Sequence, residues 1–282
     1  MLKTIFAFSW KVQISILSQL FVYQLDRIFL SRYLGLSSVA TYEVANRLAT
    51  QARTFLASIF TPIIPAASTL HAQEDSTRIV GLYNRAFKYL AVTTIPFSFL
   101  IISLAHPFVR TWLGEGFEKT AVTIQCLMAA YLVNLVPGPG SFVLSGMNKP
   151  EITMKASILA GGINLVACLI LVQTIGYYGV IIGISTSLVV SAGYFLFELH
   201  RNIPQIKWRL YADAMIKPAV VSSVLSVMIM CAQWFLDFRG YVALVIASIV
   251  YLLLYVITIV YKNDYLDEYD RSLLCKMLNR PI

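Results

Sequence analysis

Five charged residues lie inside long apolar stretches in the first fifth of the chain, and they are the side chains best placed to do chemistry. They are Asp26, Arg27, Glu43, Arg47 and Arg53. Guanidinium groups recognise phosphate and carboxylate groups through several donors at once. A carboxylate at membrane depth can carry a proton or a cation. The chemistry predicted from these residues is therefore the binding of charged groups.

The polar residues around these charges follow the period of a helix. In each of two successive segments they recur every three or four positions: Lys11, Ser15, Gln19, Tyr23, Asp26 and Arg27, then Glu43, Arg47, Thr50, Gln51, Thr54, Ser58 and Thr61. This spacing places each set along one face of a helix. Two helices that face each other along polar stripes are expected.

A turn near Gly35 fixes how the two stripes face each other. Residues equally distant from a hairpin turn lie at similar depth, which sets Asp26 and Arg27 level with Glu43. Arg47 follows Glu43 by four residues, the spacing of an intrahelical ion pair. We therefore predict a cluster of these four residues about a third of the way into the membrane, with Arg53 deeper.

Two interpretations of the charges stay open. They can neutralise one another and hold the hairpin together, which costs less than leaving single charges in the bilayer. Alternatively, Arg27, Arg47 and Arg53 project into a hydrated cavity and bind an anionic substrate, with phosphate the obvious group for guanidinium. Asp26 and Glu43 are candidates for ion coupling or ion pairing, and Asp26 could take a proton or sodium.

The composition indicates which elements must carry these residues. Of 282 residues, 58% are hydrophobic and only 13% are charged, and the mean hydropathy is +0.73. A soluble domain has about twice that charged fraction. Backbone groups cannot face lipid unpaired, so continuous apolar runs of about 20 residues are predicted to be helices. The fold class is an all-α, polytopic membrane helix bundle.

About eight transmembrane helices are expected. The predicted spans are 5–31, 38–66, 85–109, 119–145, 152–175, 178–200, 214–236 and 240–262. Polar stretches at 71–84 and 201–213 are predicted as interfacial segments or short amphipathic helices. The run from Pro137 to Gly140 should bend or break the fourth span, because proline removes a helical donor and crowds the preceding turn.

The distribution of Lys and Arg predicts the orientation. With a cytoplasmic N-terminus, 15 of the 22 basic residues lie on the cytoplasmic side, four lie on the other side, and three fall within helices. Positive loops stay cytoplasmic. Both termini are therefore expected in the cytoplasm.

Several other classes of function are disfavoured. The net charge of +8 comes from short loops, so no nucleic acid partner is expected. No His, Cys or acidic residues stand at metal-ligand spacing, so no metal or cofactor is expected. The cysteines are read as buried hydrophobes: Cys126, Cys168, Cys231 and Cys275. No nucleophile, base and electrophile combine, and the outer loops are too short for a glycan polymerase or acyltransferase, so the chain is not expected to be an enzyme.

A set of short motifs, taken in order, resembles a known family. The motifs are LDRIFLSRYLGLSSVATYEVANRL (25–48), PIIPAASTL (62–70), RTWLG (110–114), SGMNKPEI (145–152) and GYYGVIIGISTS (176–187). They resemble the second lobe of polysaccharide flippases of the O-antigen or capsule type, in the multidrug/oligosaccharidyl-lipid/polysaccharide exporter superfamily. The resemblance covers nearly the whole chain.

The resemblance implies a fold and a substrate. Family members have two six-helix lobes that rock about a central cavity and move undecaprenyl-pyrophosphate-linked oligosaccharides across the bacterial inner membrane. It implies that residues 1–200 form one such lobe, half of the two-lobe exporter fold, and that 214–262 form an appended helix pair after a linker at 201–213. Residues 263–282 would be a cytoplasmic tail. The family's cationic cavity maps loosely onto Arg27, Arg47 and Arg53.

The chain departs from the family pattern because a first lobe is missing. A cavity between two lobes then requires a missing first lobe as partner, or another copy of this chain, besides membrane lipid and the lipid-linked oligosaccharide. A C-terminal fragment of a flippase and an inactive truncated remnant both stay open. A multidrug exporter of the same superfamily is the other alternative, but its cationic substrates would favour carboxylates over arginines.

Overall fold

The computed structural model describes residues 2–235 and 240–261, and every regular element in this part of the chain is an α-helix. The predicted tail, 263–282, lies outside the described residues. In chain order the helices are α1 (Leu2–Leu34), α2 (Leu36–Ser58), α3 (Ile63–Ala72), α4 (Ser76–Leu113), α5 (Glu118–Leu135), α6 (Gly138–Gly146), α7 (Glu151–Ile175), α8 (Tyr177–Asn202), α9 (Arg209–Phe235) and α10 (Tyr241–Tyr261). The predicted fold class is confirmed.

Seven helical segments of the described residues are long and apolar enough to cross a membrane. They are α2 with α3, α4, α5 with α6, α7, α8, α9 and α10. The remaining predicted span is α1, which is not among the seven. It has 33 residues, or about 50 Å at 1.5 Å per residue, more than a bilayer needs. The eighth crossing therefore stays a prediction.

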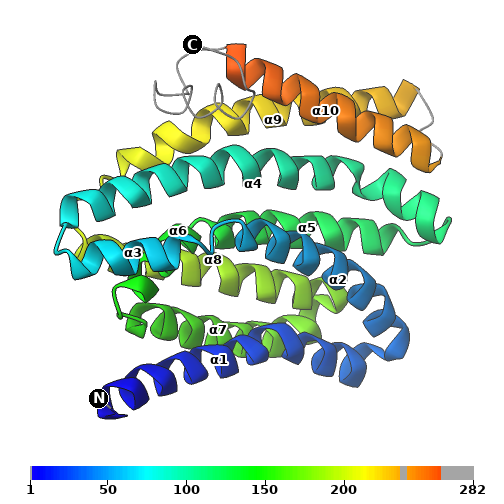
Figure 1. Cartoon of the computed structure of the whole chain (residues 1–282). Coiled ribbons are helices and arrows are strands. Elements are labelled where there is room, and N and C mark those ends of the chain that lie inside the picture. The colour runs from blue at the N-terminus through cyan, green and yellow to red at the C-terminus, as the bar shows by residue number, and fades with distance from the viewer. Residues whose placement is uncertain (1, 236–239, 262–282) are drawn as a thin grey trace.

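The long helices run side by side between two ends of the molecule (Figure 1). At one end the turns centre on glycines with positive φ, Gly35, Gly114 and Gly176, which adopt this backbone without strain. The N-terminus and the turns near Asp75 and Asn148 lie at the other end. The stretches expected to be interfacial are mostly helical, because α4 begins at Ser76 and α9 at Arg209.

Two spans are broken in the middle, and the broken pieces pack together. Residues 59–62 separate α2 from α3, and Val136 and Pro137 separate α5 from α6, as the proline and glycine run predicted. The short helices α3 and α6 contact each other. Gly146 allows this contact, because a Cβ there would lie 2.6 Å from the Ile64 carbonyl oxygen. Each break lets the backbone change direction partway along its span.

The helices stack in an order that leaves α1 at one edge and α10 at the other (Figure 1). Helix α1 packs mainly on α7, α7 on α8, α5 on α8, α2 and α4, and α9 on α4 and α10. Two main hydrophobic cores form, one toward each end of the bundle. The first includes Leu30, Tyr42 and Val180, and the second includes Phe87 and Leu199. Arg53 lies between these cores, whereas Arg47 lies on the surface of the bundle.

Candidate functional site

Three of the predicted residues form an ion-paired cluster between α1 and α2. Glu43 is the centre: its two oxygens lie 2.8 Å from Arg27 Nε and 2.9 Å from Arg47 Nε. The Glu43 side chain is 19% exposed, whereas that of Arg47 is 78% exposed. The ion pair between Glu43 and Arg47 that their spacing of four residues predicted is therefore present. Arg47 still presents most of its side chain to the surface.

Asp26 does not join this cluster, which corrects the predicted group of four. It is fully buried and points toward α2 and α7. Tyr42 Oη donates to Oδ2 at 2.6 Å, and Asn164 Nδ2 and the Cys168 thiol donate to Oδ1 at 3.2 and 3.6 Å. No ion pair among the described residues includes Asp26. Its charge is held by hydrogen-bond donors instead.

The cage around Asp26 is itself fixed by further contacts. Asn164 Nδ2 also donates to the Val22 carbonyl at 2.9 Å. The Cys168 thiol lies 3.1 Å from Asn164 Oδ1 and 3.7 Å from the Val180 carbonyl. Cys168 is buried, as predicted, but Cys126 and Cys231 are exposed, so the prediction of buried cysteines is wrong for those two; Cys275 lies outside the described residues. The cage therefore links α1 to α2 and α7 through one carboxylate, and the Cys168 thiol links α7 to α8.

Arg53 lines a cavity of about 250 Å³ between the two cores. Its Nε donates to Asn134 Oδ1 at 3.2 Å. The guanidinium carbon lies over two rings, 5.4 Å from the centroid of Tyr23 and 5.5 Å from that of Tyr131. Cation–π contacts of this kind hold a cation without a counter-charge. Of the three arginines predicted to bind substrate, Arg53 is the one that lines this cavity; Arg27 and Arg47 do not.

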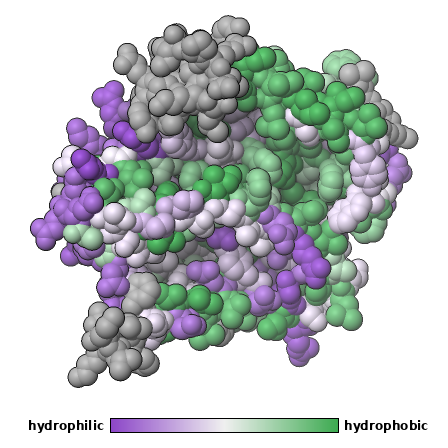
Figure 2. Space-filling model, in the orientation of Figure 1, coloured by the Kyte–Doolittle hydropathy of each residue, from purple (hydrophilic) through white to green (hydrophobic). Residues whose placement is uncertain are grey.

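The polar stripe of α2 lies on the surface of the bundle. Its exposed members include Arg47, Gln51, Thr54 and Ser58. Figure 2 shows hydrophilic residues gathered over α2, whereas hydrophobic residues dominate the part of this view where α9 and α10 lie. The helical period identified the residues that share this face. The expectation that the two polar stripes face each other is wrong, because Lys11 and Ser15 of α1 contact Glu151 and Ser157 of α7 instead.

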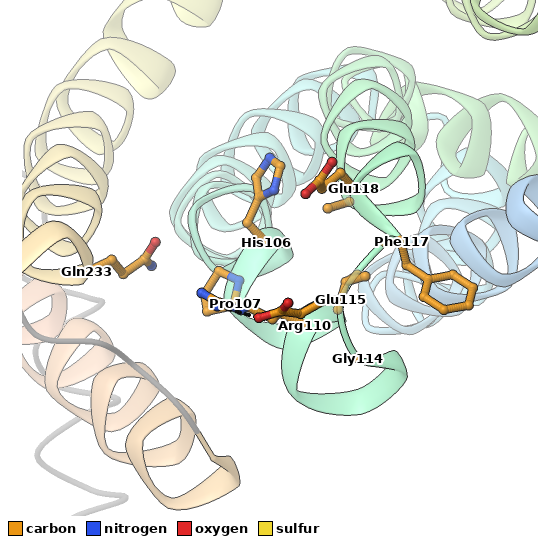
Figure 3. A pocket seen from close by; sticks show the side chains of 11 residues that line it. His106, Pro107, Arg110, Gly114, Glu115, Phe117, Glu118 and Gln233 are labelled. Atoms are coloured by element: carbon orange, nitrogen blue, oxygen red, sulfur yellow. Dashed lines mark hydrogen bonds and ion pairs between the residues drawn. The ribbon is translucent and has the colours of Figure 1, made fainter.

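A second polar pocket, of about 480 Å³, lies where α4 ends, α5 begins and α9 approaches both (Figure 3). His106, Arg110, Glu115, Glu118 and Gln233 line it. Arg110 Nη2 and Glu115 Oε1 are 2.7 Å apart. Because both signs of charge are present and partly paired, this pocket favours no single class of ligand.

Several residues of the site were not singled out from the sequence. Asn134 and Tyr131 on α5, and Asn164 on α7, gave no signal because each has apolar residues on both sides in the sequence. An Asn or Gln in an apolar helix is weak evidence for a functional site, since such side chains often form hydrogen bonds between packed helices. Their functional surroundings appear only when α1, α2, α5 and α7 come together.

The fold and the polar residues inside it define a class of protein: a helical, multi-pass membrane protein with a polar face and a cationic cavity. The comparisons with known proteins agree with this class. Residues 1–122 match a family described as "Polysaccharide biosynthesis protein". The relatives and the solved structure given below extend the match over most of the chain.

Two curated relatives and one solved structure are informative. The uncharacterized membrane protein EpsK of Bacillus subtilis is 22% identical over 198 residues, covering 69% of this chain and 39% of the relative. The probable low-salt glycan biosynthesis flippase Agl15 of Haloferax volcanii is 20% identical over 189 residues, covering 67% of this chain and 40% of the relative. The lipid II flippase MurJ, in an inward closed conformation, matches with a TM-score of 0.68 and 15% identity.

The matches cover most of this chain but only part of each related protein. The match to MurJ covers 94% of this chain but 53% of that chain. The chain thus spans about half the length of the solved structure and about two fifths of the curated relatives. Together, the family match, the relatives' names and the shared fold support a member of a flippase superfamily, and the recognition made from the sequence motifs is confirmed.

Proposed function

We propose that this chain forms one lobe of a flippase that moves undecaprenyl-pyrophosphate-linked oligosaccharide across the bacterial inner membrane during polysaccharide biosynthesis. The family match, the glycan flippase among the relatives and the fold shared with MurJ support the class of function. The substrate and the membrane are inferred from the resemblance and from the arginines. In this proposal both termini lie in the cytoplasm.

The observation that carries the proposal is the exposed polar face of α2. Arg47 is 78% exposed on a helix long and apolar enough to span a membrane. A charge facing hydrocarbon at depth costs about 3 kcal/mol or more, so such residues face a wet cavity or a partner. A water-filled passage along α2 meets this requirement, and Arg27, Arg47 and Arg53 would then bind the pyrophosphate.

A passage of this kind needs a second wall. We propose that another lobe, either a missing first lobe or a second copy of this chain, covers the α1–α2 face. Residues 1–200 would form the present lobe, 201–213 the linker and 214–262 an appended pair. That the chain spans about half of MurJ is consistent with this arrangement.

Ion coupling is proposed for Asp26, with Glu43 as the ion-paired member. Asp26 is buried with three hydrogen-bond donors and no ion-pair partner among the described residues, so a proton or a sodium ion could change its charge. Glu43 is already neutralised by Arg27 and Arg47. In this proposal Asp26 binds the coupling ion, and Glu43 neutralises the two arginines.

The charge of the cavity separates this function from its main rival. A multidrug exporter for cations would favour carboxylates, but Arg53 is the charged residue among the described residues that line the cavity. An anionic substrate is therefore favoured over a cationic one. The relatives with functional names are flippases, and the chain is proposed to act without covalent catalysis.

Complementation tests this function. The chain is expressed in a strain that lacks its polysaccharide flippase, alone and together with the first lobe of a related flippase, and surface polysaccharide is measured. Export is expected in at least one combination, and Arg47→Gln is expected to lower it at least tenfold at equal membrane abundance. Arg78→Gln is the matched control, because Arg78 pairs with Asp75 at the start of α4. Normal insertion with no export in either combination would identify a remnant and overturn the proposal.

A further inference from the structure

The carboxylate of Asp26 is a candidate for binding either a proton or a sodium ion, and the groups around it distinguish the two. The side chains of Asp26, Tyr42, Asn164 and Cys168 are all fully buried. A proton needs neither space nor a set of ligands, whereas hard cations in proteins are held by about six or more oxygen ligands. The number and direction of the oxygens near Asp26 therefore decide which ion fits.

The amide of Asn164 turns its nitrogen, and not its oxygen, toward Asp26. Asn164 Nδ2 lies 2.9 Å from the Val22 carbonyl oxygen and 3.2 Å from Asp26 Oδ1. Both of these oxygens are acceptors, so the amide atom that contacts them must be the donor, and its two hydrogens are both in use. Turning the amide over would set its oxygen against the Val22 carbonyl oxygen. Asn164 therefore offers Asp26 a donor, where a sodium ion would require an oxygen.

The sulfur of Cys168 lies among the oxygens that remain. It is 3.1 Å from Asn164 Oδ1, 3.6 Å from Asp26 Oδ1 and 3.7 Å from the Val180 carbonyl oxygen. Three oxygens are about half of the set that a hard cation takes, and hard cations prefer oxygen ligands to sulfur. The sulfur therefore occupies the position that a cation bound by these oxygens would have to take.

Helix α8 closes one side of the sulfur, and Tyr42 occupies the second oxygen of the carboxylate. A Cβ at Gly183 would lie 2.7 Å from Cys168 Sγ, so only a glycine lets the α8 backbone approach the thiol this closely. No room is left for an ion between α8 and the sulfur. Tyr42 Oη donates to Asp26 Oδ2 at 2.6 Å. Each oxygen of Asp26 therefore faces a donor, and neither faces a set of oxygens.

The same thiol suits both protonation states of Asp26. A thiol carries one weak donor, and its sulfur is a weak acceptor. When Asp26 is ionised, the Cys168 S–H can donate to Oδ1. When a proton binds at Oδ1, the new O–H donates to the sulfur, and the thiol hydrogen turns to Asn164 Oδ1 or to the Val180 carbonyl oxygen. The proton is accepted without the loss of another proton and without a donor left unpaired.

We infer that the cage around Asp26 takes a proton and excludes sodium, and that Cys168 is the residue that determines this selectivity. The other ionisable side chains near Asp26 do not compete for the proton, because phenols, thiols and guanidinium groups ordinarily hold their protons at neutral pH. They are Tyr42 on α2, Cys168 on α7, Tyr131 on α5, and Tyr23 and Arg27 on α1. Helix α8 contributes the Val180 carbonyl. That the proton drives export rests on the proposed function; the arrangement of groups around Asp26 does not.

Infrared spectroscopy of the chain in lipid nanodiscs detects the proton directly. Acidification is expected to produce the C=O stretch of a protonated carboxyl group, and Asp26→Asn should lack this band. The same acidification should shift an S–H stretch that Cys168→Ser lacks and that Cys231→Ser, which changes an exposed cysteine on α9, retains. A carboxyl band from Asp26 without a shift of the Cys168 S–H stretch would overturn the role of the thiol. Absence of an Asp26-dependent band at every pH at which the chain stays folded would overturn the proton site.

Sodium binding is measured on the same nanodiscs with radioactive sodium, and melting temperatures are compared in sodium and potassium at equal ionic strength. The wild type is expected to show no saturable sodium binding and equal melting temperatures. Cys168→Asp sets carboxylate oxygens where the sulfur lies, so it should gain saturable binding and melt higher in sodium. Saturable binding to the wild type that Asp26→Asn removes would overturn the inference. A folded Cys168→Asp chain that binds no sodium would overturn the assignment of selectivity to the thiol.

Neither measurement involves transport, so this inference and the flippase function can fail separately. Proton uptake by Asp26 with no export in any lobe combination would leave the selectivity standing and overturn the flippase function. Export together with sodium binding at Asp26 would overturn the selectivity and leave the flippase function standing.

Discussion

The α1–α2 pair and the α9–α10 pair are both built from long helices, but the polar stripe of α2 and the surface of the α9–α10 pair expose opposite chemistry. On α2 the surface residues include Arg47, Gln51 and Thr54. On α9 and α10 they are large and apolar, including Val227 and Leu253, which are 59% and 56% exposed. Lipid can cover the second surface at no cost, but not the first. The difference indicates that only the α9–α10 pair is made to face hydrocarbon.

The two pairs also differ in what they bury. Helix α1 buries a carboxylate among three donors. Helix α9 buries small hydroxyls, such as Ser226, which donates to the Phe99 carbonyl at 3.3 Å. A charge held in the interior demands complete hydrogen bonding, whereas a hydroxyl demands one partner. A substitution at a buried polar residue should therefore cost more stability in the α1–α2 pair than in the α9–α10 pair.

The largest effect is expected at Asp26. Asp26→Leu leaves the Tyr42 hydroxyl without its acceptor and takes one acceptor each from Asn164 and Cys168, at about 1–3 kcal/mol for each buried group left unpaired, so the chain should lose about 3 kcal/mol of stability. Ser226→Ala should lose about 1 kcal/mol. Thermal unfolding in detergent measures both. Asp26→Asn, which keeps an acceptor oxygen, is the control, and equal losses in the Leu and Ala variants would contradict the comparison.

A new charge should be tolerated on one surface and not on the other. Leu253→Arg on α10 is expected to cost about 3 kcal/mol in membrane insertion, the value for arginine near the centre of a spanning helix. Thr54→Arg, on the exposed stripe of α2, should insert as the wild type does. The inserted fraction of each variant is measured by protease protection. Equal insertion defects would mean that α2 also faces lipid, and the passage would be lost with it.

The smallest effects are expected for the ion pairs. Glu43→Gln weakens two contacts of a side chain that is only 19% exposed, and a cost of about 1 kcal/mol is expected. Asp213→Asn, on α9, breaks a 3.4 Å pair with Arg209 in which both side chains are more than half exposed, and less than about 0.5 kcal/mol is expected. Denaturant titration of both variants measures the difference. A larger loss in Asp213→Asn would reverse the ranking.

Much of the fold and part of the site could be predicted from the sequence. The apolar runs gave the helices, and the proline and glycine run gave the break between α5 and α6. The period of the polar residues gave the exposed stripe of α2 and the pair of Glu43 with Arg47. These features depend on residues a few positions apart, whose geometry a helix fixes.

The error at Asp26 has a simple cause. Asp26 and Arg27 are neighbours in sequence, but successive residues on an α-helix point about 100° apart. Arg27 therefore contacts Glu43 of α2 near the surface, while Asp26 faces the interior and contacts Tyr42 of α2 and Asn164 of α7. A spacing of three or four residues defines a face only to within one helical turn, so it cannot show that two adjacent residues point in different directions.

The sequence alone determined that this chain belongs in a membrane, because too few charges are present to dissolve so much apolar surface, and it located the charges that the bilayer must tolerate. Only the tertiary structure decided which charges have partners. Asn134 lies 81 residues from Arg53, and Asn164 lies 138 residues from Asp26. Whether a buried charge is satisfied depends on groups that approach through helix packing, and no local pattern encodes that approach.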